Sequence, residues 1–222
     1  MPIYLLAIPF AAVVALNVLY RMVSGRAALK VCVAVGIVQM ALAGAAIGRT
    51  LRGGSLTAPL VGLISIDVFS AVVLFVIGMI LLVTALVALS TLHGEEFNFG
   101  NVLLLLALGM NGIAMVGDLF SMYAFIEVTS ASSFILIAID KTRDELEGAF
   151  KYYLLSAIAT VAMLISIALL FALAGSTSFT AVAAYLGSAD RSPAAPVAMV
   201  LMTAALMIKS GVVPFHTWVP DA

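Results

Sequence analysis

The stretch NVLLLLALGMNGIAMVGDLFSMYAFIEVTSASSFILIAI, residues 101–139, constrains the architecture of this chain most strongly. It is apolar almost throughout, which is typical of a segment that lies inside a membrane. As a single helix it would reach about 58 Å at 1.5 Å per residue, roughly twice the thickness of the bilayer core. It must therefore fold back on itself. Gly117 followed by Asp118 predicts the turn, because glycine allows the reversal and aspartate caps the next helix.

The composition of the whole chain has the same character. Of its 222 residues, 64% are hydrophobic and only 9% are charged, and the mean hydropathy is +1.25. Soluble domains are about half apolar and about one quarter charged, so we expect an all-α integral membrane protein. The 10 Lys and Arg against 11 Asp and Glu leave no basic face for nucleic acid. The single cysteine, Cys32, cannot form an internal disulfide and is expected to be a buried small hydrophobic residue.

Apolar stretches of about the length needed to cross the bilayer recur along the chain and predict about seven transmembrane helices. They cover approximately Ile3–Leu19, Val31–Ile47, Val68–Leu92, Val102–Val116, Leu119–Ile139, Tyr152–Leu173 and Ala194–Val213. The segments between them are short and polar, so none could form an extramembrane catalytic domain.

The positive charges of these connections predict the orientation. With the N-terminus outside, six Lys and Arg fall on the cytoplasmic side and three on the outer side. Because positively charged residues near the ends of spans are enriched on the cytoplasmic side, this count favours an N-terminus outside the membrane. The expected location is the cytoplasmic membrane of a bacterium or archaeon.

Two ionisable residues lie well inside the apolar spans, Glu127 and Lys209. A charged side chain near the bilayer centre costs on the order of 3 kcal/mol on insertion scales, so its presence usually means a polar cavity and a partner. At 1.5 Å per residue the two Cα levels differ by only about 7 Å if both helices are untilted, which a lysine side chain can cover. We therefore expect an ion pair that takes up and releases protons by opening and closing. The alternative is a structural pair that only fixes helix packing.

The last span contains helix-breaking residues directly after Lys209, so its helix is expected to be interrupted there. Pro214 lacks an N–H and its ring collides with the carbonyl of Ser210, while Gly211 weakens the same turn. An interrupted helix at membrane depth is tolerated within protein or beside water, where an ion pathway would run. The alternative is that the helix simply ends there and that Lys209 extends toward the cytoplasmic interface.

Other polar residues have both a functional and a structural interpretation. Thr129, Ser130, Ser132 and Ser133 could line a proton path or join helices, and so could Asn111. Lys151 is either an ordinary flank residue or the entry to a lateral relay. Histidine as a residue type suits proton uptake, so His216 could serve a proton path, but a lone histidine at a helix end is more often structural. The sequence contains no motif for a metal, for a phosphate-binding loop or for an activated nucleophile, so we expect no cofactor and no catalytic centre.

Three segments resemble one known family in their residues and order: DLFSMYAFIEVTSASSFILIA, FKYYLL and KSGVVPFHTWVPDA. They resemble the antiporter-like subunits shared by respiratory complex I, membrane-bound hydrogenases and multisubunit sodium/proton antiporters. The resemblance implies a proton-translocating subunit without its own redox centre, in which Glu127 and Lys209 match the gating pair. Lys151 matches a basic position on the following helix, and His216, Trp218, Pro220 and Asp221 match the positions after the break.

Members of this family normally have about fourteen spans in two inverted repeats. The present chain covers a three-helix segment, residues 1–100, and an incomplete first repeat, residues 101–222. The resemblance therefore implies partners: other membrane subunits, including a separate chain with the second repeat if the remainder is not simply missing from this sequence.

The function expected from the sequence is translocation of protons, or of another cation, within a larger redox or antiporter complex embedded in lipid. Whether the subunit belongs to an enzyme depends on that parent complex. The rival hypothesis is a non-conducting scaffold that holds its neighbours together, with the charged pair serving only as a packing contact.

Overall fold

The computed structural model describes residues 2–53, 56–57, 64–189 and 192–216. The helices are α1 (Pro2–Val18), α2 (Gly25–Thr50), α3 (Val68–Thr91), α4 (Glu96–Met115), α5 (Leu119–Ile137), α6 (Arg143–Ala174), α7 (Phe179–Gly187) and α8 (Ala194–Lys209). Between α2 and α3, the two-residue strands β1 (Leu56–Thr57) and β2 (Ser65–Ile66) pair antiparallel. The expected all-α membrane architecture is confirmed, with this short pairing confined to a connection.

In the part of the chain that the structure describes, five helices, α2 to α6, are long and apolar enough to cross a membrane. The first and last of the expected spans correspond to α1 and α8, which have 17 and 16 residues and fall short of that length. The number of seven spans therefore stays a prediction.

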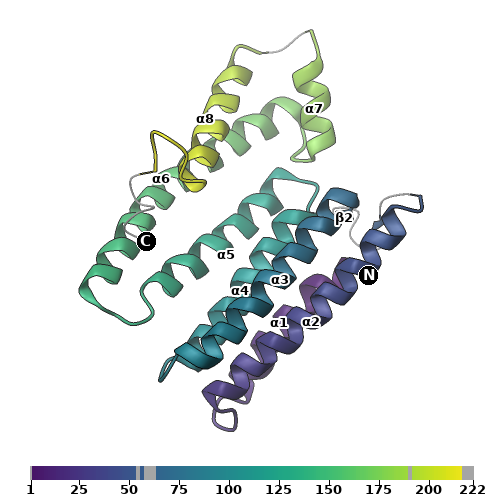
Figure 1. Ribbon diagram of the computed structural model, residues 1–222. Helices are drawn as coiled ribbons and strands as arrows, with labels where there is room; N and C mark the ends of the chain where they lie inside the picture. Colours follow the sequence, from purple (N-terminus) through teal and green to yellow (C-terminus); the bar gives the residue numbers. More distant parts are fainter. Residues whose placement is uncertain (1, 54–55, 58–63, 190–191, 217–222) are drawn as a thin grey trace.

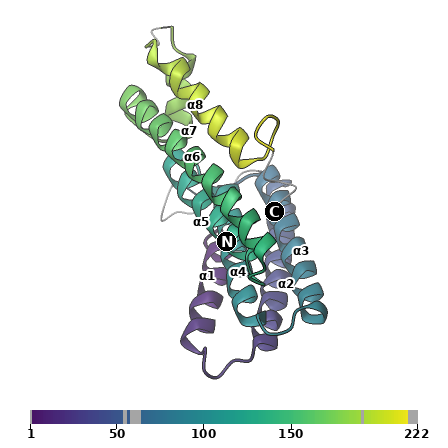
Figure 2. The same cartoon turned by 90° about the vertical axis from the view of Figure 1, so that its left-hand side faces the viewer.

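The helices form two neighbouring groups (Figure 1). Helices α1 to α4 lie side by side and share buried residues such as Leu16, Cys32 and Leu104. Helices α5 to α8 share a second apolar cluster that includes Met163 and Ala205. α4 also packs against α5, and α8 runs alongside α6, as a view turned by 90° shows (Figure 2). The site described below lies within the second group.

Three helices begin earlier than hydropathy alone predicts. α2 starts at Gly25, α4 at Glu96 and α6 at Arg143, whereas the predicted spans begin at Val31, Val102 and Tyr152. At the start of α6, Thr142 and Glu145 form a capping box, each side chain bonding the other's backbone N–H. Such a start can be polar for two turns, so a search for apolar stretches misses it.

The predicted turn between α4 and α5 is confirmed. α4 ends at Met115, α5 begins at Leu119, and Asp118 is its N-cap, with Oδ1 accepting a 2.8 Å hydrogen bond from the backbone N–H of Ser121. Backbone hydrogen bonds tie this turn to the connection after α6, because the N–H of Leu119 donates to the carbonyl of Thr177. The N-terminal end of α5 is therefore held both by its own cap and by the connection after α6.

A buried amide network joins α1, α2 and α4. Asn111 is completely buried; its Nδ2 donates to the Leu5 carbonyl at 2.9 Å and to Gln39 Oε1 at 3.0 Å. Gln39 Nε2 donates in return to Asn111 Oδ1 at 2.8 Å. Pro9 has no N–H for the Leu5 carbonyl one turn earlier, so the Asn111 amide takes that place. Of the two interpretations of Asn111, the structure favours packing.

Candidate functional site

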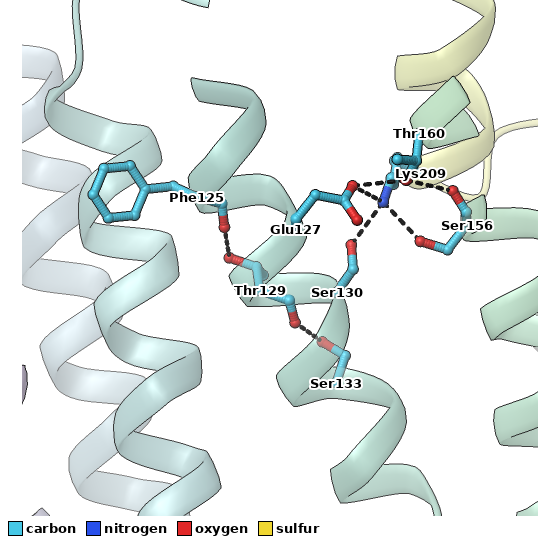
Figure 3. A network of polar contacts seen from close by, with 8 residues as sticks. All are labelled: Phe125, Glu127, Thr129, Ser130, Ser133, Ser156, Thr160 and Lys209. Atoms are coloured by element: carbon cyan, nitrogen blue, oxygen red, sulfur yellow. Dashed lines mark hydrogen bonds and ion pairs between the residues drawn. The ribbon is translucent and has the colours of Figure 1, made fainter. Parts of the chain in front are cut away.

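Glu127 on α5 and Lys209 on α8 approach each other in the middle of the second helical group (Figure 3). Lys209 Nζ lies 2.7 Å from Glu127 Oε1. The lysine side chain is only 7% exposed and the glutamate side chain 34% exposed. Two opposite charges 82 residues apart in the sequence thus form an ion pair in which the ammonium is buried and the carboxylate is partly exposed.

The ammonium group of Lys209 has an acceptor for each of its three hydrogens. Besides Glu127 Oε1, the acceptors are Ser130 Oγ at 3.0 Å and Ser156 Oγ at 2.7 Å. Both serines are buried. Because a buried charge is stable only when it is paired and fully hydrogen-bonded, this shell accounts for a lysine at this depth.

The carboxylate of Glu127 has a second donor on α6. Thr160 Oγ1 lies 2.8 Å from Glu127 Oε1, the same oxygen that Lys209 contacts. Beside this contact, a cavity of about 280 Å³ lies between α5 and α6. It is lined by Glu127, Ser130, Ala131, Phe134, Tyr153, Ser156, Ala157, Thr160 and Val161. Since one water occupies about 30 Å³ in the liquid, the cavity has room for several water molecules around the carboxylate.

The helix that carries Lys209 ends at that residue. Ser210 is the C-cap, and Gly211 follows in the left-handed region with φ +63°. The chain therefore leaves the helix just before Gly211 and Pro214, where the interruption was expected. The alternative in which Lys209 extends to the interface is wrong, because its side chain is buried against Glu127. Trp218, Pro220 and Asp221 lie outside the described residues.

α5 is held against α4 by close contact at two glycines. A Cβ placed on Gly112 would collide with the ring of Phe125, and one on Gly109 would collide with Thr129 Oγ1 and lie 3.0 Å from its backbone N. Phe125 and Thr129 lie on either side of Glu127 in sequence. In Figure 3 the Phe125 ring points away from Lys209. The close contact with α4, on the side of α5 away from Lys209, thus helps to fix the position of Glu127.

Gly112→Ala is expected to lower the free energy of unfolding by about 2 kcal/mol, because overpacking of a close contact typically costs 1–3 kcal/mol. The measurement is denaturant unfolding of the purified chain in detergent micelles. Gly44→Ala on α2 is the matched control, since a Cβ there meets nothing within 4 Å. It should stabilise the helix by about 0.5–1 kcal/mol. Equal stabilisation by both changes would contradict the close α4–α5 contact.

The remaining predicted residues lie outside this cluster. Lys151 is half-exposed on α6 and forms a 2.9 Å ion pair with Glu147 on its own helix. His216, the last described residue, is exposed. Of the hydroxyl residues near Glu127, Ser130 reaches Lys209. Thr129, Ser132 and Ser133 donate instead to backbone carbonyls of α5, as expected of residues that support a helix.

The sequence interpretation missed Ser156 and Thr160. They lie four residues apart on α6 and so share one helical face. That spacing is the only sequence feature that could have pointed to them. Among the described residues, no group of three or more His, Cys, Asp or Glu is placed to hold a metal ion.

A second, more exposed ion pair joins the connection before α4 to the connection after α5. It lies at the end of these two helices opposite Asp118. Lys141 Nζ lies 3.1 Å from Glu95 Oε1. The amide of Asn98 and the ammonium of Lys141 hold the pKa of the Glu95 carboxyl below its usual range. Because Lys141 is 70% exposed, this pair resembles ordinary surface pairs, which contribute about 0–1 kcal/mol.

Comparison with known proteins places this site in a family. Residues 114–222 match the family described as NADH:quinone oxidoreductase/Mrp antiporter, transmembrane region. These residues include Glu127, Thr160 and Lys209. Residues 114–222 belong to the family of antiporter-like subunits. The resemblance seen in the sequence is thereby confirmed.

Individual relatives of the antiporter-like subunits support this assignment. The F420H2 dehydrogenase subunit N of Methanosarcina mazei is 33% identical over 130 residues, which cover 58% of this chain and 26% of that protein. A chain of the Mrp complex from Dietzia sp. has 29% identity and a TM-score of 0.82, covering 99% of this chain and 43% of its own length.

The fold of the whole described chain also has a close counterpart. A chain of the membrane-bound sulfane sulfur reductase, an archaeal respiratory membrane complex, has a TM-score of 0.90 at 24% identity and covers 99% of this chain and 47% of its own length. At this identity the similarity shows the fold alone. The present chain spans about one quarter of the M. mazei relative and just under half of the two solved chains.

Proposed function

We propose that this chain is a membrane subunit that translocates protons, or another cation, within a larger energy-converting complex. The observation that carries the proposal is the ion pair between the buried Lys209 ammonium and the partly exposed Glu127 carboxylate, beside a cavity with room for water. Intramembrane charges of opposite sign usually mark an ion pathway. The family of residues 114–222 and its relatives in respiratory and antiporter complexes support the same function.

The proposed mechanism is charge-coupled transfer. In the closed state, each charge of the pair is stabilised by the other and by the serine and threonine hydroxyls. Separation of Lys209 from Glu127 removes the strongest of these interactions and changes the proton affinity of both groups. The ammonium can then pass a proton to water in the neighbouring cavity. Return of a proton to Lys209 lets the pair close again.

Lys151 and His216 are proposed to extend this path beyond the pair. Lys151 is on α6, which also carries Ser156 and Thr160, and it would pass protons laterally. His216 follows the end of α8, and its side chain is exposed, so it would exchange protons with water near neutral pH. Both assignments rest on the family pattern and on the position of each residue in the chain.

The proposal also covers the segments of the chain, its membrane orientation and its partners. Residues 1–100 would form an N-terminal three-helix segment, and residues 101–222 an incomplete first repeat. The subunit would lie in the cytoplasmic membrane with its N-terminus outside. Its partners would be other membrane subunits, with the second repeat supplied from outside the present sequence. Structural neighbours that are themselves chains of multisubunit membrane complexes support such partners.

Glu127→Gln and Lys209→Ala are each expected to reduce cation translocation at least tenfold, because each removes one of the two charges that the mechanism requires. The measurement is redox-driven or sodium-driven proton movement in vesicles, per assembled complex. Glu95→Gln removes the carboxylate of a pair whose lysine is 70% exposed and serves as the control with unchanged movement. Normal translocation by assembled complexes with either pair variant would refute the proposal. Reduced assembly with normal translocation per complex would favour the scaffold instead.

A further inference from the structure

We propose that Thr160 is a positioning residue whose hydroxyl alternates between the Glu127 carboxylate and the Ser156 backbone carbonyl as the ion pair closes and opens. The inference rests on the proposed function, because it assigns Thr160 a part in the same transfer. It goes beyond the charged pair by naming the group that holds the carboxylate in place.

The geometry offers one hydrogen to two acceptors. Thr160 Oγ1 lies 2.8 Å from Glu127 Oε1 and 2.9 Å from the backbone carbonyl of Ser156. A threonine hydroxyl has a single hydrogen, so it can donate to only one of them at a time. Both acceptors are already within hydrogen-bond distance. Rotation of the hydroxyl hydrogen therefore changes the partner without any movement of a heavy atom.

The charge of Glu127 decides which acceptor is preferred. Hydrogen bonds to an ionised carboxylate are roughly twice as strong as those between neutral groups. While Glu127 is ionised, Thr160 donates to Oε1 and holds the carboxylate against α6, where Lys209 also contacts it. When Glu127 is neutral, the backbone carbonyl of Ser156 is a competitive acceptor. This i−4 bond is a common alternative for threonine in helices.

The space around Glu127 allows its carboxyl group to move when Thr160 changes its hydrogen-bond acceptor. Glu127 borders the cavity between α5 and α6, so a carboxyl released by Thr160 has space to turn. Ser156 also contacts Lys209 through its Oγ at 2.7 Å. Thr160 and Ser156, one turn apart, thus hold the two members of the ion pair from one helix. The hydroxyl of Thr160 stabilises the closed pair and releases the glutamate once it is neutral.

The test compares Thr160→Val, Thr160→Ser and Thr203→Val in the assembled complex. Valine keeps the shape of threonine but removes the hydroxyl, while serine keeps the hydroxyl. Thr203 on α8 is the matched control, because it is exposed and its hydroxyl donates to the Met199 carbonyl of its own helix. Proton movement per complex should fall about tenfold in Thr160→Val, as expected when a hydrogen bond to a charged group is lost. It should stay within about twofold of wild type in Thr160→Ser and Thr203→Val.

Several results would overturn the inference. Equal losses in Thr160→Val and Thr160→Ser would mean that packing, not the hydroxyl, is what matters. Normal movement in Thr160→Val while Glu127→Gln is inactive would reject the role of Thr160 and leave the proposed function intact. Normal movement in both would reject the proposed function itself.

A spectroscopic measurement covers the case in which Thr160→Val assembles poorly. Thr160→Ala then replaces it in the comparison with Thr160→Ser. The infrared carboxylate stretch of ionised Glu127, the state in which Thr160 donates to Oε1, is identified by its loss in Glu127→Gln. Its frequency should differ from wild type in Thr160→Ala and not in Thr160→Ser. An identical band in all three proteins would contradict the contact between Thr160 and the carboxyl group.

Discussion

Lys209→Ala is expected to lower the free energy of unfolding of the chain by about 2 kcal/mol, because removing the buried partner of a partly buried ion pair leaves a carboxylate without its cation. Lys209 Nζ supplies the 2.7 Å contact to Glu127 Oε1, and its side chain is 7% exposed. Without it, Glu127 retains the hydrogen bond from Thr160 but no cation. The loss is measured by denaturant unfolding in detergent micelles.

Two further variants isolate the effect of the unpaired charge. Lys141→Ala breaks an exposed pair, with the lysine 70% exposed, and should change the free energy of unfolding by less than about 1 kcal/mol. The double variant Lys209→Met with Glu127→Leu removes both charges and should recover most of the lost stability. If Lys209→Ala were as mild as Lys141→Ala, the Lys209 ammonium would not be buried as the structure shows.

Asn111→Leu is expected to destabilise the chain by about 3 kcal/mol, since each buried polar group left without a partner costs about 1–3 kcal/mol. The leucine could not donate to the Leu5 carbonyl or exchange hydrogen bonds with Gln39. The measurement is again unfolding in micelles. Asn98→Leu on the same helix is the control, because Asn98 is exposed outside the amide network and should change stability by about 0.5 kcal/mol at most.

Pro9 provides a sharper test of the same network. In α1 the Leu5 carbonyl lacks an intrahelical donor because Pro9 has no N–H. Adding Pro9→Ala to Asn111→Leu supplies that donor and removes a proline from a helix interior. The double variant should therefore be more stable than Asn111→Leu alone. No recovery would show that the Asn111 contact to Leu5 does not compensate for the proline.

The membrane class and the positions of the long helices follow from the sequence, because hydropathy depends on local composition. The same is true of the reversal at Gly117–Asp118, where the turn residue and the cap are adjacent. The starts of α2, α4 and α6 were missed for a related reason. Their first turns are polar, and the Thr142–Glu145 capping box is a pattern that hydropathy does not detect.

The candidate site was only partly accessible to sequence reasoning. Glu127 and Lys209 stand out because charges are rare in apolar spans. Ser156 and Thr160 do not, because hydroxyl groups are common there and most bond their own helix, as Ser132 and Ser133 do. Their function as partners depends on which face of α6 meets α5 and α8. That choice is made by packing over distances of 33 to 82 residues in the sequence.

The length of α6 means that a neighbouring subunit could contact this helix outside the bilayer and so move the residues of the site that it carries. With 32 residues it extends about 48 Å, some 18 Å beyond the thickness of the hydrocarbon core. Because this excess length lies mainly in the polar first turns, α6 is expected to project from the bilayer at its N-terminal end. Its first two turns carry Arg143, Asp144, Glu145 and Glu147 and are locked by their cap, so they are suited to stand in water as a rigid rod. If a neighbouring subunit displaced this projecting end of α6, the helix would move as one body. Ser156 and Thr160 would then shift relative to Glu127 on α5.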